Sequence, residues 1–192
     1  MKKIIKLPLL ILIVSFLSGC AVLDALIPKV ETPKNANEFR KNFSKKHDSL
    51  FKKSYVVKKS HYKITKSWKA RAKKCLNKRV RVETKPAGCY FGCNKQVHYN
   101  TYLAKVKAGK KKSVLSVQFE QSGEGVGSNA VNPPGGAYFI VMDAIRISKN
   151  KTRINEYRWD LPFIKEEIVT KSILNWATGR SRSCPDLSKL HG

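Results

Sequence analysis

The chain has 192 residues, of which 39 are Lys or Arg and 13 are Asp or Glu, so its formal charge at neutral pH is +26. This length, with 42% hydrophobic residues, suits one domain with a sizeable core rather than several domains. A positive charge of this size is unusual for a monomeric globular protein.

The charge is unevenly distributed along the chain. Residues 29–119 contain 26 basic and 4 acidic side chains, whereas residues 120–192 contain 10 basic and 8 acidic ones. One interpretation is a basic surface for an anionic partner, such as phosphate-bearing lipid, an acidic envelope polymer or nucleic acid. The alternative is a composition that uses lysine freely on solvated faces. In its favour, 30 of the 39 basic residues are Lys, whereas bidentate phosphate recognition prefers Arg.

The N-terminal segment has the three-part layout of a secretory signal. Lys2, Lys3 and Lys6 precede a mostly aliphatic run at residues 7–16, and small residues then lead into Cys20. A bilayer-spanning helix needs roughly 20 apolar residues, so this run is too short for a transmembrane anchor.

Leu17-Ser18-Gly19-Cys20 resembles the lipobox of bacterial lipoprotein signal peptides. The resemblance implies a diacylglycerol on the Cys20 thiol, cleavage before Cys20, and acylation of the new amino terminus. Two or three acyl chains give stable membrane attachment. Ala21, where an Asp would retain the protein in the inner membrane, implies the periplasmic face of the outer membrane. We therefore expect a signal peptide at 1–19, a lipidated tether at 20–36 and one domain at 37–192.

The first predicted element of the domain is a basic amphipathic helix close to this anchor, with Asn37 as its N-cap. Phe39, Phe43, Leu50 and Phe51 fall near one helical face, and the other positions are basic: Lys41, Lys45, Lys46, Lys52 and Lys53. Such a helix either makes a second contact with anionic head groups or docks on the domain through its phenylalanines.

The remaining elements alternate between the helical and the strand period. A strand at 54–57 precedes a helix from Ser60 to Leu76, whose outer positions are rich in lysine. Period-two patterns then predict five antiparallel strands, at 80–82, 97–106, 114–119, 138–147 and 153–159. A last helix at 163–178 is ended by Gly179. The predicted fold class is α+β: an antiparallel sheet of about five or six strands packed on the C-terminal helix, an order similar to helix-grip proteins.

Besides Cys20 the chain has four cysteines, an even number that predicts two disulfides in an oxidising compartment. Four cysteines allow three pairings. Gly88 and Gly92 would let the segment between Cys89 and Cys93 turn back on itself, which brings these two within bridging distance. We therefore predict the disulfides Cys89–Cys93 and Cys75–Cys184.

Three short sequences resemble those of uncharacterised outer-membrane lipoproteins of Gram-negative bacteria. They are Lys73-Lys74-Cys75-Leu76, the Gly-Gly-x-Tyr sequence at 135–138, and Cys184-Pro185-Asp186-Leu187. The resemblance agrees with a Cys75–Cys184 disulfide and implies no activity.

The sequence contains no convincing catalytic constellation, so we expect no enzyme activity, no metal, and no cofactor apart from the lipid on Cys20. Cys89 and Cys93 could form a thiol oxidoreductase pair, but the three residues between them favour a structural disulfide. A metal site built from these cysteines with His61 or His98 needs reduced thiols, which an oxidising compartment disfavours. The glycine-rich stretch at 123–136 lacks the ending of a phosphate loop and predicts a long connection.

The predicted function is a binding or structural role at the cell envelope, without an identified small-molecule substrate. Anionic lipid or an envelope polymer is the preferred partner, whereas nucleic acid is disfavoured because the aromatic residues among the lysines are explained by a core. An alternative is an apolar ligand between the sheet and the last helix, under the loop at 123–136. The expected basic surface consists of Lys41, Lys45, Lys52, Lys53, Lys110, Lys111 and Lys112.

Overall fold

The computed structural model describes residues 32–43, 50–84, 95–123, 133–160 and 165–190, all within one compact unit, Thr32–Gly192. Secondary structure follows the chain in the order α3 (Ala36–Asn42), β1 (Leu50–Val57), α4 (His61–Leu76), β2 (Lys78–Thr84), β3 (Gln96–Lys107), β4 (Lys112–Gly123), β5 (Ala137–Ser148), β6 (Lys151–Trp159), α5 (Glu166–Thr178) and the 3-10 helix η1 (Leu187–Leu190).

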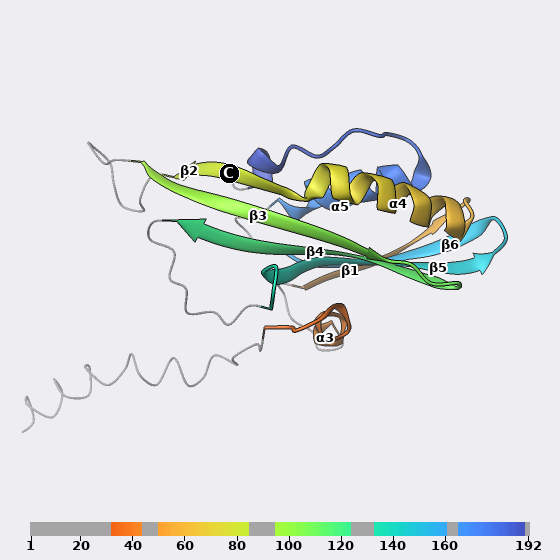
Figure 1. Ribbon diagram of the computed structural model, residues 1–192. Coiled ribbons are helices and arrows are strands. Elements are labelled where there is room, and N and C mark those ends of the chain that lie inside the picture. Colours follow the sequence, from red (N-terminus) through yellow and green to blue (C-terminus); the bar gives the residue numbers. More distant parts are fainter. Residues whose placement is uncertain (1–31, 44–49, 85–94, 124–132, 161–164, 191–192) are drawn as a thin grey trace, which may run out of the picture. The chain divides into compact units, whose positions relative to one another are not determined.

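The six strands form one open antiparallel sheet in the order β1-β6-β5-β4-β3-β2 (Figure 1). Strands β2 to β6 are a meander in which each strand pairs with the next, the arrangement that alternating apolar side chains favour. Strand β1 pairs with β6 over its whole length, from Leu50 opposite Trp159 to Val57 opposite Thr152. The α+β class and the antiparallel meander after a first strand are confirmed.

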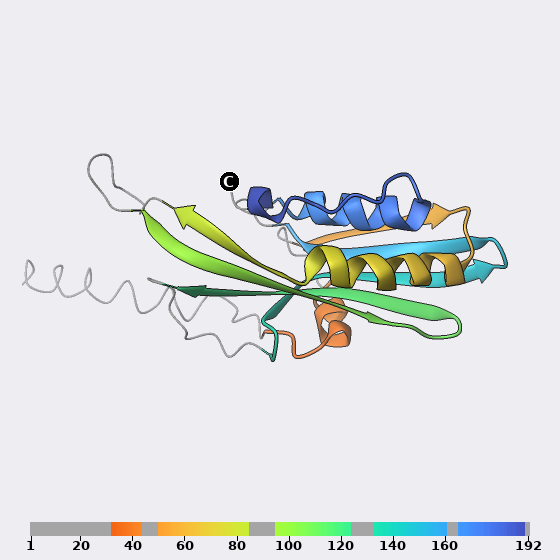
Figure 2. The same ribbon diagram turned by 45° about the horizontal axis from the view of Figure 1, so that its top comes forward.

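Helices α4 and α5 lie side by side over one face of the sheet (Figure 2). The Ser60 side chain caps α4 by accepting a hydrogen bond from the Lys63 backbone N–H at 3.4 Å. Positions three or four apart on α4 are apolar and buried against the strands and α5: Ile64, Trp68, Ala72, Cys75 and Leu76. The predicted helix from Ser60 to Leu76 and its inner face are confirmed.

Helix α5 ends where the sequence predicts. Its C-cap is Gly179, with φ of 75° in the left-handed region that glycine occupies without steric cost. The Arg180 N–H then bonds back to the Asn175 carbonyl at 3.0 Å. Inside the core, the Trp68 indole N–H donates to the Ile173 carbonyl at 3.2 Å, which ties α4 to α5. The predicted first residues of this helix, 163 and 164, lie outside the described residues.

The predicted basic helix near the N-terminus differs from the observed structure. Helix α3 begins after Asn35, whose side chain caps it in place of Asn37, and it ends at Asn42. Residues 50–53 belong to β1, which therefore starts at Leu50 rather than at Ser54. Leu50 and Phe51 match the helical spacing of the earlier phenylalanines, but long-range pairing with β6 overrides this local pattern.

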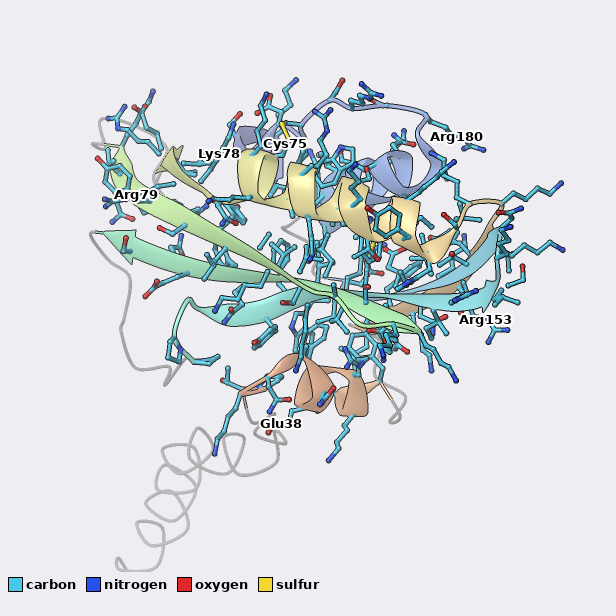
Figure 3. All side chains as sticks on the ribbon, turned by 45° about the vertical axis from the view of Figure 1, so that its right-hand side comes forward. Glu38, Cys75, Lys78, Arg79, Arg153 and Arg180 are labelled. Carbon is cyan, nitrogen blue, oxygen red and sulfur yellow. A yellow bond between two sulfur atoms is a disulfide. The ribbon has the colours of Figure 1, made fainter. Side chains whose placement is uncertain are left out.

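Helix α3 packs on the face of the sheet opposite to α4 and α5 (Figure 1). Phe39 is fully buried there among rings from α3, β5 and β6: Phe43, Tyr138 and Trp159. The Arg40 guanidinium pairs with the buried Asp143 carboxylate at 3.2 Å. Figure 3 shows Glu38 of α3 and Arg180 beyond α5 on opposite sides of the sheet.

Two of the predicted connections are also observed. Lys149 and Asn150 join β5 to β6, and residues 108–111 join β3 to β4. Before β5, Gly136 has φ of 89° and approaches β4 so closely that a Cβ would collide with the Phe119 carbonyl. Most of the predicted loop at 123–136 lies outside the described residues.

Candidate anion-binding site

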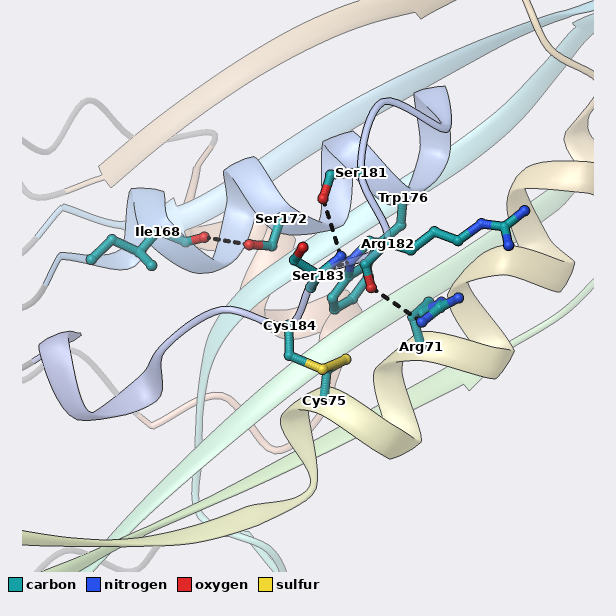
Figure 4. Close-up of a disulfide and its surroundings, with 9 residues drawn as sticks. All are labelled: Arg71, Cys75, Ile168, Ser172, Trp176, Ser181, Arg182, Ser183 and Cys184. Carbon is teal, nitrogen blue, oxygen red and sulfur yellow. Dashed lines mark hydrogen bonds between the residues drawn. A yellow bond between two sulfur atoms is a disulfide. The ribbon is translucent and has the colours of Figure 1, made fainter.

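The Cys75–Cys184 disulfide joins the last turn of α4 to the segment that follows α5 (Figure 4). The two Cα atoms are 5.0 Å apart, and the two residues are separated by 109 positions in the sequence. The predicted pairing is confirmed for these cysteines. Cys89, Cys93 and Cys20 lie outside the described residues, so the second disulfide and the lipidation site stay predictions.

Hydrogen bonds hold the same segment against both helices (Figure 4). The Arg71 side chain donates through Nη1 to the Arg182 carbonyl at 3.1 Å, and the Trp176 indole N–H donates to the Ser183 carbonyl at 2.8 Å. Further along, Leu187 and Leu190 are buried in the core. The chain after α5 is therefore part of the fold, fixed at several points.

The outer face of α4 is uniformly basic. In a helix of 16 residues it presents six cations and no carboxylate: Lys63, Lys66, Lys69, Arg71, Lys73 and Lys74. None of the six forms an ion pair with a carboxylate in the described part of the chain. Like charges three or four residues apart on a helix destabilise it by about 0.2–0.5 kcal/mol per pair. The face therefore carries a repulsion that an anion would relieve.

A groove of about 380 Å³ lies between α4 and the segment that begins at Gly179. Its charged lining is entirely basic and comes from three separate parts of the chain: Lys59, Lys63, Lys66, Arg71 and Arg182. The Lys59 ammonium lies against Gly179, where a Cβ would collide with it. This places a cation at the carbonyl end of α5, the end that attracts positive charge.

The sequence has no match to a family model or to a curated protein. Within the described ranges, no three His, Cys, Asp or Glu side chains lie close enough together to hold a metal ion. No helix in that part of the chain is long and apolar enough to cross a membrane.

Lys52 and Lys53, predicted to lie on the basic helix, belong to β1 and project to opposite sides of the sheet. Lys52 lies over the Tyr157 ring, with its Nζ 5.7 Å from the ring centroid, on the α3 side. Lys53 lies over the Tyr55 ring at 5.5 Å, on the side of α4 and α5. Because successive side chains of a strand alternate, these two lysines cannot share a surface.

The other expected lysines are also dispersed. Lys112 pairs with the buried Asp143 carboxylate at 2.8 Å, which makes it a structural contact. Lys41 is exposed on α3, whereas Lys110 and Lys111 are exposed in the connection between β3 and β4. Lys45 lies outside the described residues. None of the described members of the expected basic surface lines the groove between α4 and the segment after α5, whereas Lys110 lines a neighbouring groove along α4.

A second charged cluster is buried between β6 and α5. Arg158 donates through Nε to Glu156 at 3.1 Å and through Nη1 to Asp160 at 2.9 Å, and its Nη1 lies 3.8 Å from the Glu166 carboxylate. Glu156 and Glu166 are at most 1% exposed. The Tyr55 hydroxyl donates to Glu156 at 2.8 Å, and burial, followed by this bond, raises the pKa of Tyr55. The cluster connects α5 to β6 and β1.

A wider groove, of about 520 Å³, runs beside this cluster between β1 and α5. Phe51, Val57 and Leu174 supply apolar lining, whereas Glu156 and Arg158 supply charge at its base. The Arg158 guanidinium also stacks on the Phe51 ring, 4.1 Å from its centroid. The groove has room for a small ligand that carries both apolar and polar groups.

A serine–histidine pair that the sequence spacing did not indicate joins β4 to α4. The Ser113 hydroxyl lies 2.9 Å from Nε2 of His61 and 2.8 Å from the Thr65 hydroxyl, which also donates to the His61 carbonyl. Ser113 is fully buried, so a substrate cannot reach its oxygen. Burial, followed by the charge of Arg146, lowers the pKa of His61. This arrangement serves packing rather than nucleophilic catalysis.

Proposed function

We propose that this protein is a lipid-anchored protein of the cell envelope that binds an anionic partner through the basic face of α4. The observation that carries the proposal is the set of six cations on α4, with no carboxylate on the helix and no ion-pair partner among the described residues. Binding an anion there replaces cation–cation repulsion with attraction. The partner is anionic lipid or an acidic envelope polymer.

The membrane attachment in this proposal comes from the lipobox-like sequence at residues 17–20. A diacylglycerol and an N-acyl chain on Cys20 would hold the protein at the periplasmic face of the outer membrane, since multiple chains anchor stably. Mass spectrometry of the full chain produced in a Gram-negative host tests this step. The expected result is a lipid-modified Cys20 at the amino terminus, and an unmodified Met1 or Cys20 would refute the anchor.

Vesicle binding tests the anionic partner. The unit Thr32–Gly192 should bind vesicles that contain phosphatidylglycerol and not vesicles of phosphatidylcholine alone, and the binding should weaken as salt screens the charges. The double variant Lys69→Gln with Lys73→Gln, on the outer face of α4, should bind less. The matched control is Lys105→Gln with Lys107→Gln, because these exposed lysines of β3 lie on the opposite face of the sheet. Equal binding by both double variants would contradict the proposal.

A second candidate function is supported by the groove between β1 and α5. Its volume of about 520 Å³ and mixed lining suit a small amphipathic ligand. The chain order also resembles the helix-grip arrangement, with a strand, a helix, a five-stranded meander and a C-terminal helix. A fluorescent fatty acid that binds wild type but not Leu174→Trp, which fills the groove, would favour this candidate.

A further inference from the structure

We infer that the groove between α4 and the segment after α5 is a site for a phosphate-type anion, such as the phosphate or pyrophosphate group of a larger molecule. The inference deepens the proposed function and rests on it, because it gives the anionic partner a chemical group and a place. The groove is lined by Lys59, Lys63, Lys66, Arg71 and Arg182, without any carboxylate.

The two arginines favour phosphate over other anions. Arg71 uses one N–H to bond the Arg182 carbonyl at 3.1 Å, which orients its guanidinium at the groove. A guanidinium has five N–H groups in a planar fork, so the donors that remain can bind two oxygens of one phosphate. The groove between β1 and α5 also contains arginines, Arg158 and Arg180, but the carboxylates of Glu156 and Glu167 line it with them.

The walls of the groove are fixed before a ligand arrives. Ser67 donates to the Trp176 carbonyl at 3.0 Å, Trp176 donates to the Ser183 carbonyl, and the Cys75–Cys184 disulfide ties the segment after α5 covalently to α4. A preorganised site avoids the entropic cost of ordering a loop on binding. Lys59 at the carbonyl end of α5 also offsets the partial negative charge that would repel an anion there.

A larger anion can extend beyond this groove along α4. A neighbouring groove on the other side of Lys66 is lined by Lys66, Lys69 and Lys110, again without a carboxylate. The two grooves share Lys66 and Ala70 in their linings. A chain of phosphates or a phosphate-bearing polymer could therefore contact both.

The test is titration of the detergent-solubilised full chain with sodium pyrophosphate at constant ionic strength, followed by calorimetry and by the thermal unfolding midpoint. We expect binding that raises the midpoint, because a ligand of the folded state stabilises it. The double variant Lys63→Gln with Lys66→Gln should lose about tenfold in affinity. Arg71→Lys keeps the charge but not the fork and should also bind more weakly, whereas Lys105→Gln with Lys107→Gln should bind like wild type.

Vesicles containing phosphatidic acid form the second arm and distinguish the source of the phosphate. If the groove variants lose pyrophosphate and vesicle binding together, the ligand is a lipid headgroup; if they lose only pyrophosphate, it is a soluble phosphate. The proposed site would be refuted if all variants bound pyrophosphate with the affinity of wild type, or if wild type did not bind pyrophosphate. Salt-sensitive vesicle binding by wild type would in that case leave the proposed function standing. Urea midpoints of the variants confirm that each is folded.

Discussion

Arg158 is surrounded by carboxylates from β6 and α5 in the interior, where charge is costly unless it is paired. Its place follows from the alternation of β6: Ile154, Glu156 and Arg158 share the face that packs on the helices. The alternation of apolar and polar residues in β6 is enough to predict that Glu156 and Arg158 lie in the core. Their partner Glu166 could not be assigned, because the same residue also suits the positive end of the helix dipole.

Replacing Arg158 by Met should lower the free energy of unfolding by about 3–5 kcal/mol, because Glu156 and Glu166 would become uncompensated buried carboxylates. Urea denaturation at pH 7 measures the loss. The control is Arg153→Met on the exposed side of β6, which should change stability by less than about 0.5 kcal/mol. Equal effects of the two variants would contradict the structural role of the cluster.

His61 should make the contact between α4 and β4 sensitive to acid. Its pKa is lowered in the folded protein by burial and by Arg146, so the unfolded chain takes up the proton first as the pH falls. The stability from this residue is therefore complete above about pH 6.5 and decreases below it. The measurement is the urea midpoint at pH 7.5 and at pH 5.5. We expect this midpoint to fall less between the two pH values in His61→Gln than in wild type. An unchanged pH dependence would rule out this contribution.

Among the elements, α4 and the segment after α5 are held together covalently by the disulfide. The chain-entropy treatment gives about 4–5 kcal/mol for a loop of this length, 109 positions. The double variant Cys75→Ala with Cys184→Ala should therefore unfold at a clearly lower urea concentration. It should also bind pyrophosphate more weakly, because the segment that carries Arg182 is no longer held covalently to α4. A change below about 1 kcal/mol would contradict the first expectation.

Most strands were predictable because their alternation is strong, and α4 was predictable from Ser60 and its apolar spacing. The start of β1 was not, because Leu50 and Phe51 also fit a helical period and only pairing with distant β6 decides between the two. The groove beside α4 is not predictable from the sequence for a similar reason. The apolar spacing of α4 places its lysines outward, but the opposing wall with Arg182 becomes a neighbour only through long-range contacts.

In the domain as a whole, the sheet lies between the helix that follows the predicted tether and the basic groove proposed to bind an anion. Helix α3, which follows the predicted tether, packs on one face, and the basic groove lies on the other. The face of the sheet that is turned to the anchoring membrane would therefore decide whether the groove meets lipid of that membrane or an envelope polymer beyond it.

Collisional quenching can test this orientation on neutral vesicles that carry the lipidated protein. A fluorophore at Lys41→Cys on α3 should be quenched by a lipid-attached quencher more strongly than one at Lys69→Cys on α4. The physical reason is distance, since the two helices lie on opposite faces of the sheet. Equal quenching would show that the tether lets the domain rotate freely.

The pairing of β1 with β6 also sets the order in which the protein can fold. Ser54 and Asn155, whose side chains bond across these strands, are 101 positions apart, so β1 must wait for its neighbour until most of the chain exists. The other four pairings of the sheet join consecutive strands, and such local contacts can form earlier. Strand β1 therefore joins a sheet whose other strands can already be paired.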